Sequence, residues 1–382
     1  MIVAQRTLIN ILLITVDNLP THFMTKEKSA LFLEGVAASP NPASSCASIL
    51  LGVHASAHGI RHSLKDFEGY IRPLPYILRN AGYATATIGS ACVRSVRSLK
   101  DRQPLYDMSI LPNSTNGEEI TRKTIWHLER LQSPYFLHVN LHRSRDEDFT
   151  LENLINKIIG KSNALSIVTG LSGQFQGPPQ RNLLDSLSVP IIVLQGSNTQ
   201  RVNQINVLGC HVDITVIILR AAGIPLAGYL EGIDLLRKGV PRRRACIATV
   251  LPNKVALVTQ SWKVVYDPEN DVSHFFRKTI ASSQQLLAST TPRWSSAQPS
   301  DIIEEKLIFQ LLRWRARQIS LAAILSRMPP KLNSAKVTSP KLNRNGKPRK
   351  ARVVDITQRL LWDMRGSTSE LELQDMIDSY DL

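Results

Sequence analysis

The chain is short of acidic residues, of cysteines and of aromatic side chains, and each shortage narrows what it can do. Its 382 residues include 46 lysines and arginines but only 31 acids, a formal net charge of +15. Such an excess favours an anionic partner, which could be nucleic acid, an anionic membrane surface or an acidic protein, although a basic surface can also have no dedicated partner. The four cysteines are scattered and form no CxxC pair. We therefore expect neither a zinc site nor a disulfide framework, and we expect a reducing compartment.

No hydrophobic run approaches the length that a membrane-spanning helix needs. The run LINILLITV, residues 8–16, ends directly at Asp17 and has no small-residue cleavage site after it. It is too short for a bilayer and lacks the pattern of a signal peptide, so we interpret it as a buried strand. We accordingly expect a cytoplasmic protein or one in an organelle interior, not a secreted one.

What the sequence does contain is an alternation of short apolar strands and amphipathic helices over its first 240 residues. Runs rich in valine, isoleucine and leucine predict parallel strands buried on both faces, at residues 10–16, 83–89, 135–141, 164–170 and 189–195. Helices are predicted between them, at 73–82, 117–132 and 211–225. This alternation indicates an α/β sheet covered by helices on both faces.

The remainder of the chain changes character three times. Residues 245–276 predict two or three antiparallel strands with turns at Pro252–Asn253 and Asp267–Pro268, and a long helix is expected at 301–327. Beyond it lie a basic, proline-containing stretch and then a segment whose charges are acidic after Arg365. We divide the chain into an α/β domain, a small domain with a hairpin and a helix, a basic linker or arm, and an acidic segment: 1–240, 241–328, 329–353 and 354–382.

Several of these segments, in this order, resemble the sulfatases of the alkaline phosphatase superfamily. NILLITVDNL resembles the first strand of the family, ASILLGVHASAHGI its catalytic helix ASLLTG with the following HRHGI, and PLPYILRNAGYATATIG its LAELLKEAGYRTALIG. SPYFLHVNLH resembles its third strand, VDITVIILRAAGIPLAGYLEGIDLL its VDLAPTLLDLAGIPVPEGLDGRSLL, and SWKVVYDPEN the KLIYDPEN hairpin of its small domain. The resemblance covers roughly residues 8–275. It implies a mostly parallel alkaline phosphatase-like sheet sandwiched by helices, with a small antiparallel C-terminal domain.

The resemblance also implies where catalysis would take place. A sulfatase attacks its ester with a formylglycine made from Cys or Ser in a C/S-x-P-x-R motif, and phosphatase relatives use Ser or Thr. The nucleophile sits at a helix N-terminus, where free amides help to hold the anion. A divalent cation held by carboxylates polarises the ester.

Carried over position by position, most of this site is missing. Asp17 matches the first metal ligand and Asn18 the second, but the nucleophile position holds Pro42 and the position of the family's arginine holds Cys46. The late metal motif TSDHG aligns with TGLSG. Its acid and histidine positions are therefore Leu171 and Ser172. Other family positions fall on Ser90, Cys92 and the basic stretch RSR at 143–145. A calcium ion takes about six to eight oxygen ligands, so we expect no catalytic group and no bound metal, with calcium or magnesium as the alternative if the site is active.

Three neighbouring features offer alternative chemistry. Ser44 and Ser45 lie close to the missing nucleophile and could replace it after a small shift, although serines at this place also serve as N-caps. Histidines 54, 58 and 62 recur at helical spacing and resemble a metal-binding face, which a helix end at Gly59 would disrupt. The stretch GLSGQ around Ser172 is one residue short of a G-x-S-x-G elbow and has no evident acid and base partners.

The C-terminal part of the chain carries the candidate partner-binding residues. Arg313 and Arg317 share a helix face, and the arm after that helix is basic and free of aromatic side chains, so contacts to nucleic acid would be mainly electrostatic. A solvated helix face is the simpler alternative. The candidates are Arg313, Arg315, Arg317, Lys341, Arg344, Lys347, Arg349, Lys350 and Arg352.

These observations favour a sulfatase-like protein that has lost catalysis and serves as a structural or interaction subunit of a larger assembly. Two alternatives stay open. The protein could be an active sulfuric or phosphoric ester hydrolase with a relocated site, or a nucleic-acid-associated protein that acts through its basic tail.

Overall fold

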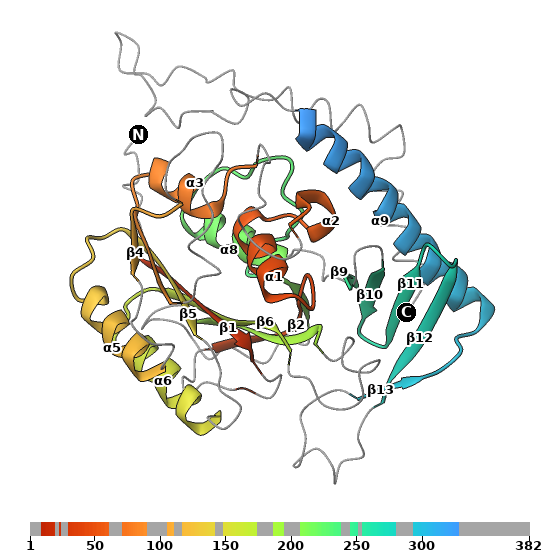
Figure 1. Ribbon diagram of the computed structural model, residues 1–382, viewed down its shortest axis with the longest axis horizontal. Coiled ribbons are helices and arrows are strands. Elements are labelled where there is room, and N and C mark those ends of the chain that lie inside the picture. The colour runs from red at the N-terminus through yellow and green to blue at the C-terminus, as the bar shows by residue number, and fades with distance from the viewer. Residues whose placement is uncertain are drawn as a thin grey trace.

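The computed structural model describes residues 9–19, 23, 30–60, 71–89, 105–110, 117–141, 148–173, 186–194, 207–237, 245–250, 254–279 and 293–327. These residues form two sheets with helices around them (Figure 1). The large sheet has eight strands and the small sheet has five. The fold class predicted from the sequence is confirmed.

The large sheet is mostly parallel and has the strand order β4-β3-β5-β1-β6-β7-β2-β8. Its strands are β1 (Ile11–Asn18), β2 (Ala30–Val36), β3 (Ala84–Gly89), β4 (Met108–Ile110), β5 (Tyr135–Leu141), β6 (Leu165–Ser172), β7 (Ser188–Leu194) and β8 (Leu208–Cys210). Central β1 pairs in parallel with β5 and β6. Strand β7 was predicted to be parallel, but it runs antiparallel to both β6 and β2. A strand buried on both faces needs the same apolar run in either direction, so its sequence does not indicate its direction.

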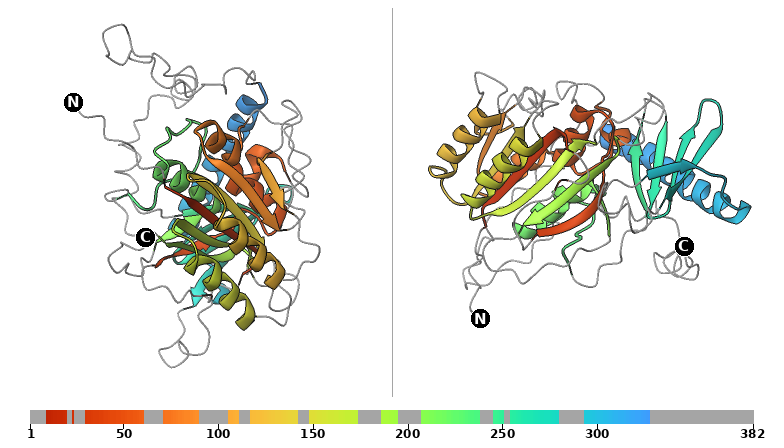
Figure 2. Two further views of the ribbon diagram at one scale, coloured as in Figure 1. Left: turned by 90° about the vertical axis from the view of Figure 1, so that its left-hand side faces the viewer. Right: turned by 90° about the horizontal axis from the view of Figure 1, so that it is seen from below.

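Helices cover both faces of this sheet (Figure 2). One face packs against α1 (Pro42–Leu51), α2 (Ala55–His58), α3 (Leu74–Asn80) and α8 (His211–Ala221). The opposite face packs against α5 (Gly117–Leu128) and α6 (Asp148–Gly160). Because side chains alternate along a strand, Ile11 and Leu13 of β1 enter the first core, and Leu12 and Ile14 enter the second.

The small sheet is antiparallel and has the order β13-β12-β11-β10-β9. Its strands are β9 (Ala245–Thr249), β10 (Val255–Thr259), β11 (Trp262–Asp267), β12 (Val272–Thr279) and β13 (Arg293–Ser296), so it has more strands than the two or three predicted. One face packs against Val36, Leu208 and Val212 of the large α/β unit. Lys278 Nζ reinforces this junction 2.6 Å from Glu34 Oε1.

The long helix α9 (Asp301–Arg327) covers the other face of the small sheet, and its bounds agree with the predicted 301–327. Its Leu307 and Leu311 are buried against Val264 and Phe275. Further along, Leu321 and Leu325 join the core beside α1 and α2. Figure 1 shows the helix running along the outer side of the small sheet. It therefore ties the small sheet to the helical layer of the large one.

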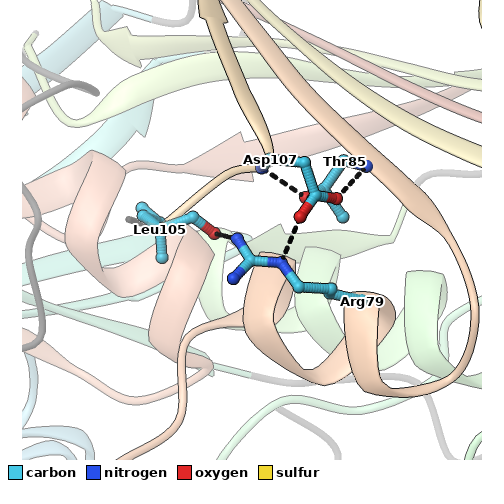
Figure 3. Close-up of polar contacts among 4 residues, drawn as sticks. All are labelled: Arg79, Thr85, Leu105 and Asp107. Atoms are coloured by element: carbon cyan, nitrogen blue, oxygen red, sulfur yellow. Dashed lines mark hydrogen bonds and ion pairs between the residues drawn. The ribbon is translucent and has the colours of Figure 1, made fainter. Parts of the chain in front are cut away.

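An ion pair stabilises the edge of the large sheet at β4 and β3. Arg79 of α3 places Nε 2.7 Å from Asp107 Oδ1 and donates from Nη2 to the Leu105 carbonyl oxygen at 2.8 Å (Figure 3). Asp107 Oδ2 also accepts from the backbone N–H and the hydroxyl of Thr85. These contacts hold residues 105–107 in place and thereby position Tyr106, which reaches the interior of the site described below.

Within the part of the chain that the structure describes, no helix is both long enough and apolar enough to cross a membrane.

Candidate functional site

The candidate site lies at the carboxyl ends of β1 and β6, beside the N-terminus of α1. In parallel α/β sheets, ligands bind outside the carboxyl ends of the strands. Asn18 of β1 stands opposite Ser172 of β6 in the pairing register. The structure thus brings together Asp17, Asn18, Leu171 and Ser172, which the sequence comparison aligned with the metal ligands.

The N-terminus of α1 is closed by a side chain. Asn41 is the N-cap, and its Oδ1 accepts from the backbone N–H groups of Ala43 and Ser44 at 2.9 and 3.2 Å. Pro42 occupies the first helical position, where it supplies neither a nucleophile nor an N–H group. The amides that would stabilise an anion at this helix end are therefore already hydrogen-bonded to Asn41 or absent.

The two serines beside Pro42 are buried and do not cap the helix, contrary to the expectation that a serine would serve as the N-cap. Ser45 Oγ donates to the carbonyl oxygen of Ser39 at 2.7 Å and accepts from the N–H of the same residue at 3.1 Å. Ser44 is buried at the start of the helix, and Cys46 packs inside the core below it. A nucleophile must reach a substrate, so the geometry of Ser45 fits a structural serine.

Hydrogen bonds join Asp17, Asn18 and Ser172 at the ends of the two strands. Ser172 Oγ lies 2.7 Å from the Asp17 carbonyl oxygen and 2.7 Å from Asn18 Oδ1, and it can donate to either. Asn140 Nδ2 lies 3.4 Å from Asp17 Oδ1 and 3.0 Å from Thr15 Oγ1. The amide oxygen of Asn18, aligned with a second metal ligand, thus lies within hydrogen-bonding distance of a neighbouring hydroxyl.

Leu171 places a hydrocarbon side chain at the position that the sequence comparison aligned with an acidic metal ligand. Its side chain is fully buried in the same core as Cys46 and Ile49 of α1. A carboxylate at this depth needs a cation or several donors to compensate for its lost hydration. The leucine instead closes the space between β6 and α1 with apolar packing.

These residues do not fit the metal ion that the fold family implies. Calcium takes about six to eight oxygen ligands, usually including several carboxylates. Among the described residues, no group of three or more histidines, cysteines and acids is placed to hold a metal ion. Of the described residues at the ends of β1 and β6, Asp17 supplies the one carboxylate, and the reaction of the family cannot be derived from it.

A chain of buried polar side chains lies beneath the site, and sequence reasoning missed it. Tyr106 OH lies 2.8 Å from His138 Nδ1, and His138 Nε2 lies 2.9 Å from Thr15 Oγ1, which in turn accepts from Asn140. Burial lowers the pKa of His138 to about 3 and raises the pKa of Tyr106 well above its ordinary value. Both groups are therefore neutral at pH 7. The sequence did contain a signal for this network: His138 and Asn140 in YFLHVNL are two positions apart and therefore lie on one face of the strand.

His211, the first residue of α8, was also missed as a site residue. Its Nδ1 accepts from the backbone N–H of Ala38 at 3.2 Å. The proton therefore resides on Nε2, which donates to the Gly170 carbonyl oxygen at 2.8 Å. Burial lowers the pKa of His211 to about 4. This neutral ring joins the ends of β2, β6 and α8 and is not available as a base.

The described histidines 54 and 58 do not form a metal-binding face on one helix, in agreement with the predicted helix end at Gly59. His54 is the N-cap residue of α2 with extended backbone angles, and Gly59 ends this helix in the left-handed conformation, as predicted. His58 Nδ1 accepts from the N–H of Ile60, so its Nε2–H points at Ser48 Oγ, 2.9 Å away. A general base would need a lone pair at that nitrogen, so this serine and histidine do not form a catalytic pair. His62 lies outside the described residues, as do Ser90, Cys92 and residues 143–145.

The structure separates the three arginines of α9. Arg313 and Arg317 are exposed on one side of the helix, whereas Arg315 is half-buried with its guanidinium 6.0 Å from the ring centre of Tyr266. The pair at 313 and 317 is thus the accessible part of the predicted basic face. The other candidates lie outside the described residues: Lys341, Arg344, Lys347, Arg349, Lys350 and Arg352.

Comparison with known proteins finds likeness in structure but none in sequence. No family model matches the chain, and none of the curated proteins matches it. A solved protein in the alkaline phosphatase superfamily from Vibrio parahaemolyticus superposes with a TM-score of 0.58 at 12% identity, over 81% of this chain and 88% of that one. A 2-O GAG sulfatase gives 0.58 at 11% identity, over 81% and 92%. The lipoteichoic acid synthase LtaP from Listeria monocytogenes gives 0.57 at 12% identity, over 84% and 94%.

The chain therefore has the fold of the alkaline phosphatase superfamily, and it shares that fold with sulfatases. The resemblance noted in the sequence is confirmed at the level of the fold.

Proposed function

We propose that the protein is a catalytically inactive protein of sulfatase-like fold that serves as a structural or interaction subunit of a larger assembly. The observation that supports the proposal is the apolar and hydrogen-bonded packing at the positions that the sequence comparison aligned with the family's site. Proline stands at the nucleophile position, Leu171 fills the position of an acidic ligand, and Ser172 bonds to the neighbouring strand. The sheet, the helical layers and the small sheet remain, and these provide a stable body and surface.

The proposal is tested first on chemistry. The purified full-length chain should show no saturable binding of Ca²⁺, Mg²⁺, Mn²⁺ or Zn²⁺ by calorimetry, and no turnover of p-nitrophenyl sulfate or p-nitrophenyl phosphate above the buffer rate. Saturable binding together with turnover that Asp17→Ala abolishes would overturn it.

The relocated hydrolase site is tested with Ser44→Ala and Ser45→Ala. Because the Ser45 hydroxyl makes two buried hydrogen bonds, we expect Ser45→Ala to lower the melting temperature and to leave ester hydrolysis at background. Measurable wild-type hydrolysis that either variant abolishes without a change in melting temperature would instead favour the relocated site.

The interaction role predicts that the protein from its native source is part of a particle larger than the purified chain, as measured by sedimentation of a tagged copy. Sedimentation of the native protein as the free chain would contradict it. If nuclease treatment dissolved the particle and deletion of 329–352 removed its salt dependence, the nucleic-acid alternative would be favoured.

A further inference from the structure

The outer face of α9 carries apolar side chains at a strict seven-residue spacing. Ile302, Phe309 and Ala316 follow one another at intervals of seven, and Leu312 and Ile319 form a second series with the same interval. This a/d pattern is the one that helices use to pack against another helix. We call these five residues the outer stripe.

The outer stripe is exposed to an unusual degree. Ile302 and Ile319 are each 65% exposed, Phe309 is 62% exposed and Leu312 is 43% exposed. The opposite side of the same helix is buried through Leu307 and Leu311, so the stripe does not contribute to the core of the small sheet. Exposed apolar side chains in a continuous row indicate a surface that another segment covers.

The charges beside the outer stripe indicate what charge a segment that binds there should carry. On a helix of 100° per residue, Lys306, Arg313 and Arg317 lie along one edge of the stripe, and no acid lies among them. In an antiparallel pairing of two copies, this edge would face the same edge of the second copy, and like charges would meet. A parallel pairing would place Glu305, which lies within the stripe, against its own copy. The stripe therefore favours an acidic occupant over a second copy.

The chain itself contains a segment of that chemistry. Residues 366–382 read GSTSELELQDMIDSYDL and contain five acids and no basic residue. Plotted at helical spacing, Leu373, Met376, Ile377 and Tyr380 share one face, and the acids lie around it. Apolar side chains with acidic neighbours complement a stripe with a basic edge.

The length of the intervening chain allows the contact. Residues 328–365 connect the end of α9 to this segment. From residue 327 back to residue 302 the helix measures about 38 Å at 1.5 Å per residue. An extended connection of this length can reach more than about 100 Å, so the segment can reach any part of the stripe. A tethered partner also has a high effective concentration.

We propose that residues 366–382 bind the outer stripe of α9 in the same chain, with their acids against Lys306, Arg313 and Arg317. The contact shields the apolar row and makes its exposure dependent on the segment, so a competing acidic amphipathic helix would displace it. This inference is independent of whether the site at the strand ends is inactive.

The test replaces Phe309 in the full-length chain with the photo-crosslinker p-benzoylphenylalanine. The matched control carries the same group at Trp126, an exposed aromatic residue on α5. After illumination, mass spectrometry should find position 309 linked to peptides from 366–382 within a monomer, and position 126 should show no such link. Links from position 309 to a second copy, to no segment, or to the same peptides as position 126 would overturn the proposal.

Two further variants separate the apolar and charged contributions. Arg313→Glu with Arg317→Glu should reduce the crosslink at least fivefold, and Leu373→Ser with Met376→Ser and Ile377→Ser should abolish it. Arg313 and Arg317 are exposed, and circular dichroism of both sets of variants checks that the fold is unchanged. A crosslink yield that neither set of substitutions changes would show that the contact is not specific and would overturn the proposal.

Discussion

The carboxyl edge of the large sheet and the outer face of α9 differ in which side chains they bury and which they expose. At the sheet edge, buried or half-buried polar groups are hydrogen-bonded within the fold, as Ser172 is to Asn18 and Asn41 is to the amides of α1. On α9, apolar groups that a core would bury are exposed. The difference shows that polar residues at strand ends need not be accessible to a ligand, and that apolar residues on a helix need not be part of a core. The first region bonds its polar side chains within the fold, and the second exposes apolar side chains.

The largest expected effect comes from restoring an acid to the sheet edge. We expect Leu171→Asp to reduce the free energy of unfolding by about 4 kcal/mol or more, because it buries a carboxylate in an apolar core with no cation to pair with. The volume-conserving control Leu171→Met should cost less than about 1.5 kcal/mol. Urea denaturation checks both. If the aspartate variant were as stable as the methionine variant, or gained stability with calcium, the site would be open rather than filled.

Substitution of two neighbouring leucines compares how much the two sides of α9 contribute to stability. Leu311→Ala removes a fully buried side chain and should cost about 2–5 kcal/mol. Leu312→Ala acts on the outer stripe and should change stability by less than that, within about 1 kcal/mol even if residues 366–382 cover it. Thermal unfolding of the two variants measures the difference. Equal losses would place both faces of the helix in the core.

The buried histidines predict a loss of stability on acidification. The pKa values of His138 and His211 are lowered by burial to about 3 and about 4 from 6.5. Between pH 6.5 and 4 the unfolded chain binds more protons at these groups than the folded chain, so stability falls as the pH falls, by about 1.4 kcal/mol per pH unit for each group.

Urea denaturation at pH 7, 6 and 5 measures this slope, and His138→Gln should make it shallower by the contribution of one group. A stability that stays constant from pH 7 to pH 5 would contradict the neutral buried state of these rings.

The smallest effect is expected at the cap of α1. Asn41→Ala leaves two amides without their acceptor and should cost about 1 kcal/mol, whereas Asn41→Asp should retain the cap. Differential scanning calorimetry checks the pair. If the alanine variant were unchanged in stability and acquired affinity for sulfate, the helix end would be a latent anion site.

Much of the fold could be predicted because its signals are local. The strand at 135–141 and the helix at 301–327 have the predicted bounds, since each is defined by the periodicity of its own residues. Helix α6 and strand β2 were missed, although α6 has apolar residues at 151, 155 and 158 with helical spacing. The candidate site was located from the sequence through the residues at aligned positions, Pro42, Leu171 and Ser172, and the loss of catalysis stays a prediction.

The sequence by itself determined the alternation of elements, the excess of positive charge and the presence of proline and leucine where catalysis would require reactive groups. Only the tertiary structure decided which side chains meet. The hydrogen bond from Ser172 to Asn18 joins residues 154 positions apart, and the contact between Tyr106 and His138 spans 32. The pairing and direction of the strands set these contacts. Whether a leucine of α9 is buried or exposed likewise depends on which surface the helix covers, and a local pattern does not contain that information.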